Sequence, residues 1–328
     1  MQGDDLIVKK SILIKIKGKL SKNYMGKIII KGYHYFIAIP LAKVYSIKFH
    51  FIKRKLKTIS FFSIDQTFEL LTQEKKSLSR FGDGEIAWIY KDSKGYFGQE
   101  NSQQLSDRLM EVITSNNTQV IVGVPDFFGT MEGYSRKRIE SRNTHLAKYY
   151  KRWMHLLEEE KIYADSLVTR VYNGRNVGKS TIIFEKWKSV WEDKDVLLIE
   201  GSKTRFGVNN DLMENVRSIK RIIAPAENAF EKYSEILTSV RKYLSEDCIV
   251  LISLGPTATI MSYDIGVQGY QAIDIGHLDV EYEWYLLNSN KKDHLVGKYV
   301  NESGGAPSIE FSNEILEKYN SEIIEFIS

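Results

Sequence analysis

The sequence is poor in cysteine and proline, and these shortages narrow the classes of protein that it can encode. Cys248 is the one cysteine, which excludes a disulfide framework and a zinc site made of cysteines alone. Five prolines among 328 residues, with no low-complexity segment, indicate that nearly all of the chain packs. The chain is 43% hydrophobic and 27% charged, as in ordinary globular proteins, so fibrous and wholly disordered architectures are excluded.

Two common phosphate-binding motifs are also missing. No segment has the Gly-x-x-x-x-Gly-Lys-Ser/Thr spacing of a Walker loop. No Gly-x-Gly-x-x-Gly follows a predicted strand, which disfavours NAD and FAD as cofactors. A ligand that carries phosphate groups therefore has to be bound by other loops.

The positive charge of the chain is concentrated near its start. Residues 1–60 hold fourteen Lys or Arg and two acids, a net charge of +12. The whole chain has a net charge of +4, so residues 61–328 carry −8. The basic segment is also rich in aromatic and aliphatic side chains. We therefore expect a basic N-terminal extension, residues 1–60, on a mildly acidic body.

The extension does not have the pattern of a membrane-spanning helix, because Lys43 and Lys48 interrupt its apolar stretch. A cleaved signal is not expected either, since Asp4 and Asp5 precede the first lysines and no small-residue cleavage site follows. Mixed basic and aromatic residues favour contact with anionic lipid headgroups, with simple packing on the body as the alternative, over nucleic acid. We expect a cytoplasmic protein, peripheral on the inner face of the cell membrane, with no nucleic-acid partner.

From Phe61 onward, strand-like and helix-like segments alternate. Short apolar runs predict buried strands, and segments with apolar residues at helical spacing predict the helices between them. This alternation is typical of an α/β fold with a mainly parallel, doubly wound, Rossmann-like sheet. The expected strands are 119–124, 167–172, 195–199, 218–223, 248–254 and 271–275, and the expected helices are 105–113, 144–157, 181–191, 229–244 and 257–267.

An acidic, glycine-rich turn precedes the first predicted strand. It contains Asp83 and Glu85, one residue apart and each preceded by a glycine. Two such carboxylates form a hard-oxygen site for Mg²⁺ or Mn²⁺. The nearby Arg80 has a guanidinium fork that suits a phosphate. Acidic turns with glycine are also common on solvated surfaces, so the Asp-x-Glu motif alone leaves both interpretations open.

The loops after two further strands suit an anionic ligand, because ligands of such sheets bind beyond the carboxyl ends of the strands. The loop after Ile199 gathers hydroxyls, amides and cations, among them Arg205 and Asn209, although ordinary polar loops have similar compositions. After the strand 248–254, a helix begins with the sequence Gly-Pro-Thr, and its free N–H groups could bind an anion. The residues of this helix start are Gly255, Pro256 and Thr257.

The last predicted strand is followed by a histidine and several carboxylates. Asp279 and Glu283 are four residues apart and should share one face of a helix. His277, Asp279 and Glu281 are candidates for a general base or for binding sugar hydroxyls, although a lone histidine is more often structural. These residues predict a metal-assisted enzyme that acts on a phosphate-bearing ligand, with glycosyl transfer, phosphoryl transfer and hydrolysis all open.

Several of these motifs, in this order, resemble those of bacterial GT-D glycosyltransferases. The resemblance extends over roughly residues 70–303, and its motifs are 80–85, 191–207, 253–259 and 272–277. It implies a GT-D type Rossmann-like domain. With the flanking sequence patterns, we expect three parts, which are the extension 1–60, the glycosyltransferase domain 61–303 and a helical tail 304–328.

The resemblance implies transfer of a hexose, with glucose expected, from a UDP-sugar to a hydroxyl of a glycan acceptor. Relatives extend glycans on serine-rich adhesins or act in surface-polysaccharide pathways, so the expected partners are a nucleotide sugar and a glycan or glycoprotein. It implies Mn²⁺ or Mg²⁺ near Asp83 and Glu85. The remaining roles depend on strand-end position alone: donor binding by Arg80, Arg205, Asn209, Gly255, Pro256 and Thr257, and a catalytic base among Asp279, His277 and Glu281. A metal-dependent nucleotide or phosphate hydrolase and a non-catalytic partner of another glycosyltransferase are the alternatives.

Overall fold

The computed structural model describes residues 39–91, 95–96, 98–129, 131–175, 177–289, 294–300 and 310–328, together with four residues between 28 and 36. Most of the predicted extension before residue 39, including Asp4 and Asp5, lies outside the described residues. Residues 304–309, the beginning of the predicted tail, also lie outside them.

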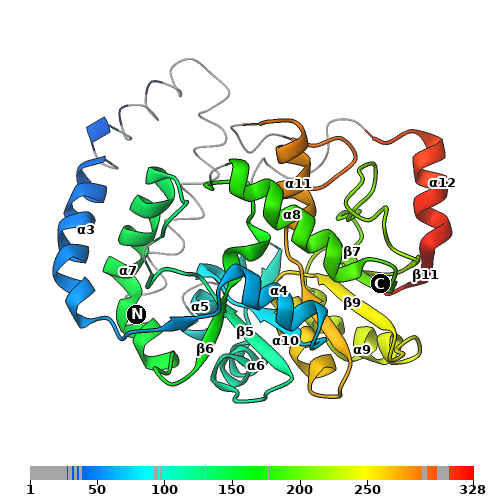
Figure 1. The fold of residues 1–328 in the computed structure, drawn as a ribbon, viewed down its shortest axis with the longest axis horizontal. Coiled ribbons are helices and arrows are strands. Elements are labelled where there is room, and N and C mark those ends of the chain that lie inside the picture. The colour runs from blue at the N-terminus through cyan, green and yellow to red at the C-terminus, as the bar shows by residue number, and fades with distance from the viewer. Residues whose placement is uncertain are drawn as a thin grey trace.

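The described residues form one large sheet of nine strands, all paired in parallel (Figure 1). The strand order is β1-β6-β5-β2-β10-β9-β7-β8-β11. The bounds are β1 Ser60–Phe61, β2 Ser77–Arg80, β5 Val120–Val124, β6 Ile162–Asp165, β7 Asp195–Gly201, β8 Ser218–Ala224, β9 Cys248–Ser253, β10 Gln271–Asp274 and β11 Ile323–Phe326. A separate antiparallel hairpin pairs β3 (Gly95–Tyr96) with β4 (Gln99–Glu100).

Helices cover both faces of this sheet. Along β7, Val196 and Leu198 pack with α4 and α8, whereas Leu197 and Ile199 pack with α9 and α10. Successive side chains of a strand point to opposite faces, so the two clusters lie on opposite sides of the sheet. The predicted α/β, doubly wound, mainly parallel sheet is confirmed. The helices are α3 Ile39–Ile52, α4 Ile64–Thr72, α5 Asp83–Ile89, α6 Gln103–Thr114, α7 Arg136–Leu156, α8 Val177–Trp191, α9 Tyr233–Arg241, α10 Pro256–Gly266, α11 Leu278–Leu286 and α12 Asn313–Glu322.

One predicted strand is wrong, whereas the other five and all the predicted helices correspond to observed elements. Residues 167–172 were expected to form a strand, but the chain forms a 3₁₀ helix over Ser166–Thr169, and the strand β6 precedes it. The Asp165 carboxylate accepts the N–H of Leu167 at 2.9 Å, which turns the chain out of the strand. The run is apolar because it is buried under α8, and burial alone does not distinguish a strand from a short helix.

The strand β2 was not predicted, although it lies near the middle of the sheet between β5 and β10. It has only four residues, and two of them are serines, so it lacks the apolar run of the other strands. Ser79 is fully buried, and its hydroxyl is 2.9 Å from that of Ser262 on α10. A buried hydrogen bond thus replaces apolar packing at this position.

The two ends of the described chain join the body in different ways. Near the start, α3 packs along α7 at one edge of the molecule (Figure 1). At the other end, the predicted helical tail is helical in α12, but the prediction is wrong for Ile323–Phe326, which form β11 beside β8. No helix in the described part of the chain is long and apolar enough to cross a membrane.

Candidate active site

A cavity of about 860 Å³ lies where the strands β2, β7, β9 and β10 end. Its size is within the range of small-molecule sites in proteins. The loops after these strands form part of the cavity wall, and side chains of α7 and α11 form further parts of it. The parallel sheet therefore brings the predicted strand-end loops to a single site, as expected for this architecture.

The Asp-x-Glu motif is at the cavity because β2 leads directly into α5. Asp83 and Glu85 occupy the first turn of α5, and both line the cavity. Glu85 Oε2 accepts the N–H of Gly82 at 2.7 Å and so caps its own helix, whereas Asp83 is exposed. Burial raises the pKa of Glu85 to about 7, and the carboxylates of Asp274 and Asp83 add to this shift.

These two carboxylates fit a metal ion that is shared with a phosphate. The described residues contain no group of three or more His, Cys, Asp or Glu that could hold an ion by themselves. Mg²⁺ and similar ions, however, are commonly held by one or two carboxylates together with substrate phosphates and water. A cation at Asp83 and Glu85 would also offset the unfavourable burial of the Glu85 carboxylate.

Arg80 borders the cavity, but its donors are already bound to protein groups. Its Nε and Nη2 donate to the main-chain oxygen and to Oδ1 of Asp274, both at 2.6 Å. Its Nη1 donates to the hydroxyl of Thr169 at 2.6 Å. Arg80 therefore ties the end of β2 to the end of β10 and to the 3₁₀ helix after β6. Burial raises the pKa of Asp274, and the positive charge of Arg80 counteracts part of this shift.

The structure does not bring Arg205 and Asn209 to the cavity. The Arg205 guanidinium donates to the main-chain oxygen of Gly297 at 2.8 Å and to Glu310 at 2.6 Å. The loop after β7 contributes Lys203 and Thr204 to the cavity wall instead.

The helix start at α10 is at the cavity, as predicted for Gly255 and Pro256. Gly255 has a φ of +55°, which favours glycine, and the space beside its α-carbon is open. The N-terminus of α10 can therefore approach a ligand closely. Thr257 is fully buried and does not line the cavity.

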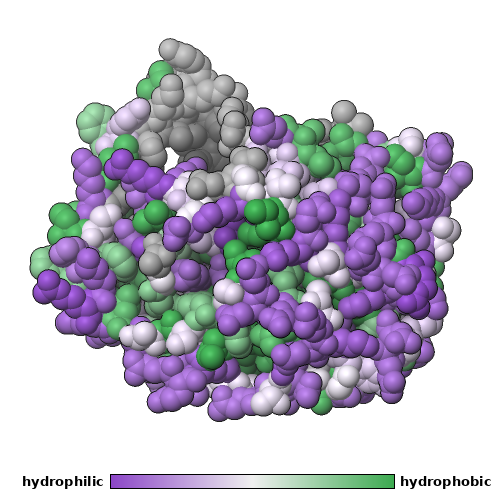
Figure 2. Space-filling view, in the orientation of Figure 1, coloured by the Kyte–Doolittle hydropathy of each residue, from purple (hydrophilic) through white to green (hydrophobic). Residues whose placement is uncertain are grey.

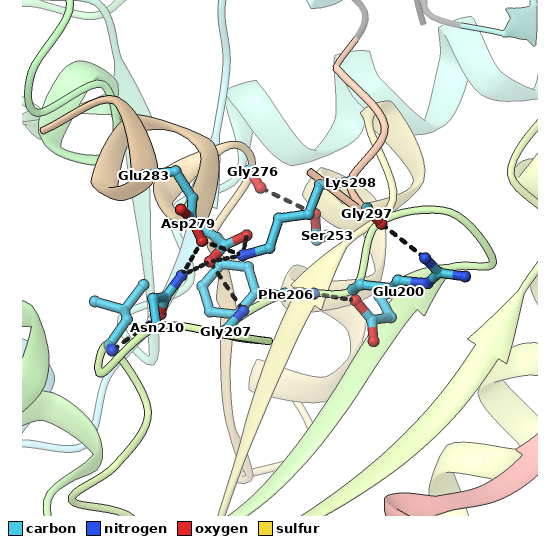
Figure 3. Close-up of polar contacts among 12 residues, drawn as sticks. Glu200, Phe206, Gly207, Asn210, Ser253, Gly276, Asp279, Glu283, Gly297 and Lys298 are labelled. Atoms are coloured by element: carbon cyan, nitrogen blue, oxygen red, sulfur yellow. Dashed lines mark hydrogen bonds and ion pairs between the residues drawn. The ribbon is translucent and has the colours of Figure 1, made fainter. Parts of the chain in front are cut away.

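Asp279 lines the cavity within a network of hydrogen bonds (Figure 3). It accepts the N–H of Gly207 at 3.0 Å, the amide of Asn210 at 2.8 Å, and Lys298 Nζ at 2.9 and 2.7 Å. Glu283, four residues further along α11, accepts from the same Asn210 and from Lys298 at 2.7 and 2.8 Å. The predicted shared helix face of Asp279 and Glu283 is confirmed. Both oxygens of Asp279 are occupied.

Glu281 and His277 also line the cavity, and Arg170 lies between them. Glu281 Oε2 accepts the main-chain N–H groups of Tyr172 and Asn173 at 3.1 and 2.6 Å. Its Oε1 is 3.6 Å from Arg170 Nη1 and has no hydrogen-bond partner among the described residues. Arg170 Nη2 is 3.1 Å from His277 Nδ1. An arginine only donates, so Nδ1 accepts, and the neutral ring carries its proton on Nε2.

Sequence reasoning missed Arg170 after the 3₁₀ helix and three residues of α7, His145, Lys148 and Tyr149, which all line the cavity. Arg170 lies just after β6, but the misplaced strand hid this strand-end position. On α7, His145 lines the cavity and accepts the indole N–H of Trp153 at 2.8 Å, and burial lowers its pKa. Lys148 and Tyr149 lie beside it. The helical spacing of this segment predicted a helix, but it did not single out these three side chains.

Comparison with known proteins agrees with this site. The family model described as "Glycosyltransferase GT-D fold" matches residues 78–303. One curated relative is "Probable glycosyl transferase Gly" of Streptococcus gordonii, which is 35% identical over 82% of this chain and 39% of its own length. Another is "Glycosyltransferase GlyD" of Streptococcus pneumoniae, which is 33% identical over 83% of this chain and 33% of its own length. This chain thus spans about a third to two fifths of the length of these relatives.

Solved structures agree as well. A structure described as "A New Glycosyltransferase (DUF1792) from Streptococcus sanguinis" is 34% identical, with a TM-score of 0.76, and covers 83% of this chain and 100% of its own. A second, described as "The highly conserved domain of unknown function 1792 has a distinct glycosyltransferase fold", is 32% identical, with a TM-score of 0.78, and covers 86% of this chain and 100% of its own.

The matched segment begins in β2, just before the Asp-x-Glu motif, and includes the strand-end loops that form the cavity. It covers well over half of the chain, and the structural agreement extends over the whole of the solved chains. The predicted fold family and the predicted enzyme class are both confirmed at this level. The chain belongs to the family of glycosyltransferases with the GT-D fold.

Proposed function

We propose that this protein transfers a hexose, with glucose as the first candidate, from a UDP-sugar to a hydroxyl of a glycan acceptor. The acceptor would belong to a bacterial glycoprotein or surface polysaccharide. The observation that supports this proposal most directly is the single cavity that joins the Asp-x-Glu motif, the start of α10 and the carboxylates of α11. A phosphate-bearing donor and a hydroxyl acceptor need these kinds of group side by side.

Asp83 and Glu85 are the residues that would hold a divalent ion, Mn²⁺ or Mg²⁺. Such an ion, when bound, neutralises the charge that develops on a leaving diphosphate. The exposed Asp83 carboxylate faces the cavity, and Glu85 is held at a defined position by its bond to Gly82.

The donor diphosphate would bind to the free N–H groups at the start of α10, with Lys203 as a nearby cation. Gly255 leaves room for this approach. Arg80, which is bound to Asp274 and Thr169, would position the strand ends and not bind phosphate. Arg205, Asn209 and Thr257 lie away from the cavity wall and have no role in this scheme.

Glu281 is the proposed base for the acceptor hydroxyl if the reaction inverts the anomeric carbon. Its Oε1 is buried, has no hydrogen-bond partner among the described residues and lies 3.6 Å from Arg170 Nη1. Asp279 is saturated by Lys298, Asn210 and Gly207. His277 presents Nε2–H, which suits binding to a sugar or phosphate oxygen.

The donor site is tested by thermal unfolding with a panel of nucleotide sugars, with and without Mn²⁺. A ligand of the folded state raises the melting temperature. We expect a metal-dependent rise with one UDP-sugar and its loss in Asp83→Ala/Glu85→Ala. The absence of a shift with every nucleotide sugar would favour a non-catalytic partner protein. Release of free sugar or phosphate at the same rate without an acceptor would favour a hydrolase.

The proposed base is tested separately with Glu281→Gln, which keeps an acceptor for the N–H groups of Tyr172 and Asn173. We expect the rate of transfer to fall about a hundredfold or more, as is usual for the loss of a general base. The rise in melting temperature with the UDP-sugar should be the same as in the wild type. A loss of UDP-sugar binding as large as the loss of transfer rate would contradict the role of Glu281 as a base.

A further inference from the structure

The helix α3 exposes an apolar stripe on the side that faces away from the body. Val44, Ile47 and Phe51, spaced as on one face of a helix, are 58%, 63% and 68% exposed, and Leu41 beside them is 44% exposed. The α3 helix lies along the edge of the molecule, where Figure 2 shows hydrophobic and hydrophilic residues side by side. An exposed stripe of this kind marks a surface that binds something apolar.

The opposite face of α3 is firmly packed, so the exposed stripe is not the result of a loosely attached helix. Ile52 is buried, and Phe49 packs into the cluster formed with α7. The Arg142 guanidinium lies over the ring of Phe49 at 5.0 Å, and Lys148 lies over the ring of Tyr45 at 4.6 Å. The helix is thus apolar on two sides. Among the described residues, one side packs against α7, and the side with Val44, Ile47 and Phe51 contacts no other element.

The apolar stripe is flanked by positive charge only. At about 100° per residue, Lys43 and Lys48 lie on either side of the stripe, and both are exposed. The exposed Lys53, Arg54 and Lys55 follow at the end of the helix. From residue 39 to residue 64 the chain has no Asp or Glu.

We propose that α3 binds an anionic lipid bilayer, lying parallel to its surface with Val44, Ile47 and Phe51 inserted among the lipids. Apolar side chains flanked by lysines are the pattern of an interfacial helix, since the apolar face enters the headgroup boundary while the cations contact lipid phosphates. With 14 residues, α3 is about 21 Å long, which is too short to cross a hydrocarbon core.

The charge pattern distinguishes the bilayer from other occupants. A second copy of the chain on the same face would bring two sets of lysines together, at a cost in electrostatic energy. Binding of nucleic acid would use the cations but leave the apolar stripe in water. An anionic bilayer satisfies both features. This proposal concerns residues outside the segment matched by the family model and does not depend on the proposed donor or acceptor.

The proposal also places the cavity close to the membrane. The side chains of Arg142 and Lys148 line the cavity and contact the packed face of α3. The helix α7 therefore lies between α3 and the cavity.

The test is sedimentation of the full chain with vesicles of phosphatidylcholine, with and without phosphatidylglycerol. We expect binding to the anionic vesicles and weaker binding at high salt. Phe51→Ser should lower the partition coefficient about tenfold, the effect of losing one inserted aromatic side chain. Lys43→Gln/Lys48→Gln should lower it by a similar factor. The matched control is Phe326→Ser on β11, at the far edge of the sheet, because Phe326 is 70% exposed and should leave binding unchanged.

A second measurement locates the contact. All five tryptophans are fully buried, so Val44→Trp introduces a reporter whose fluorescence brominated lipids should quench. Absence of vesicle binding, equal binding by the wild type and Phe51→Ser, or no quenching at position 44 would each overturn the proposal. A dimer in light scattering without vesicles, dissociated by Phe51→Ser, would overturn it in favour of a second copy of the chain.

Discussion

At the scale of single residues, the site depends on side chains whose partners are far away in the sequence. Arg80 binds Asp274, which is 194 residues away, and this pair joins two strand ends at the floor of the cavity. Gly276 lies against the Arg80 guanidinium, so a β-carbon there would be 2.1 Å from Nη2. The φ of Gly276 is +47°, where other residues are strained.

Gly276→Ala should therefore lower the free energy of unfolding by about 2 kcal/mol or more, because backbone strain and displacement of Arg80 add together. Urea unfolding measures this loss. The matched control is Gly269→Ala, since Gly269 also has a positive φ, +91°, but has nothing within 4 Å of a β-carbon. Equal losses in the two variants would show that the contact with Arg80 has no effect.

Glu85 should make the stability of the protein depend on pH. Its pKa is about 7 in the folded state and 4.5 in an unperturbed carboxyl, so the unfolded chain releases this proton first as the pH rises. The free energy of unfolding should then fall between about pH 4.5 and pH 7, by at most about 3 kcal/mol from this residue.

The measurement is urea unfolding across this pH range without divalent ions, for the wild type and Glu85→Gln. The glutamine keeps an acceptor for Gly82 but does not titrate, so the variant should lose less stability as the pH rises. The same slope in both proteins would contradict the expected burial of Glu85.

At the scale of elements, a buried ion cluster fixes α11 against the loop after β7 (Figure 3). Lys298 is 1% exposed and lies between Asp279 and Glu283 of α11, while Asn210 of the loop donates to both carboxylates. Removing one partner of a buried ion pair leaves the other charge without compensation. The cluster thus positions the cavity wall that carries Glu281 and Lys203.

Lys298→Met should lower the free energy of unfolding by about 3–5 kcal/mol, because the buried Asp279 and the partly buried Glu283 lose their cation. Asp279→Asn should lower the free energy of unfolding by less, since Lys298 keeps its ion pair with Glu283. The double variant should then cost less than the sum of the single ones, and a double-mutant cycle by urea unfolding measures this coupling. Strict additivity would mean that Lys298 and Asp279 do not interact in solution.

At the scale of the whole molecule, the sheet continues beyond the segment that the family model covers. The strand β11 pairs with β8 after residue 303, and α12 packs Tyr319 on the same edge. Arg221 of β8, 2% exposed, donates to Glu200 and to Glu322 of α12. The last residues therefore complete the core and are not a separate tail.

Truncation after residue 312 should lower the free energy of unfolding by about 3 kcal/mol or more, because it exposes the apolar edge of β8 and removes one partner of Arg221. Thermal and urea unfolding measure this loss. Tyr319→Ala is a milder variant that keeps β11 and should lose part of the same stability. An unchanged melting temperature after truncation would instead support a domain boundary at residue 303.

Sequence alone determined the fold class, most of the elements and the edge of the sheet where the site lies. Periodicity and apolar runs are local properties, and parallel strands place their carboxyl ends together whatever the rest of the chain does. For this reason Gly255, His277 and Glu281 could be assigned to one site before the structure was known, whereas Asp83 and Glu85 were assigned from their motif and the family resemblance.

Only the tertiary structure decided what each side chain binds. Arg80 and Arg205 resemble phosphate ligands in the sequence, yet they bind Asp274 and Glu310. The positions of His145, Lys148 and Tyr149 at the cavity and of β11 in the sheet were hidden for the same reason. A polar side chain binds whichever partner the fold brings within about 3 Å, and this choice depends on residues that are distant in the sequence, which no local pattern records.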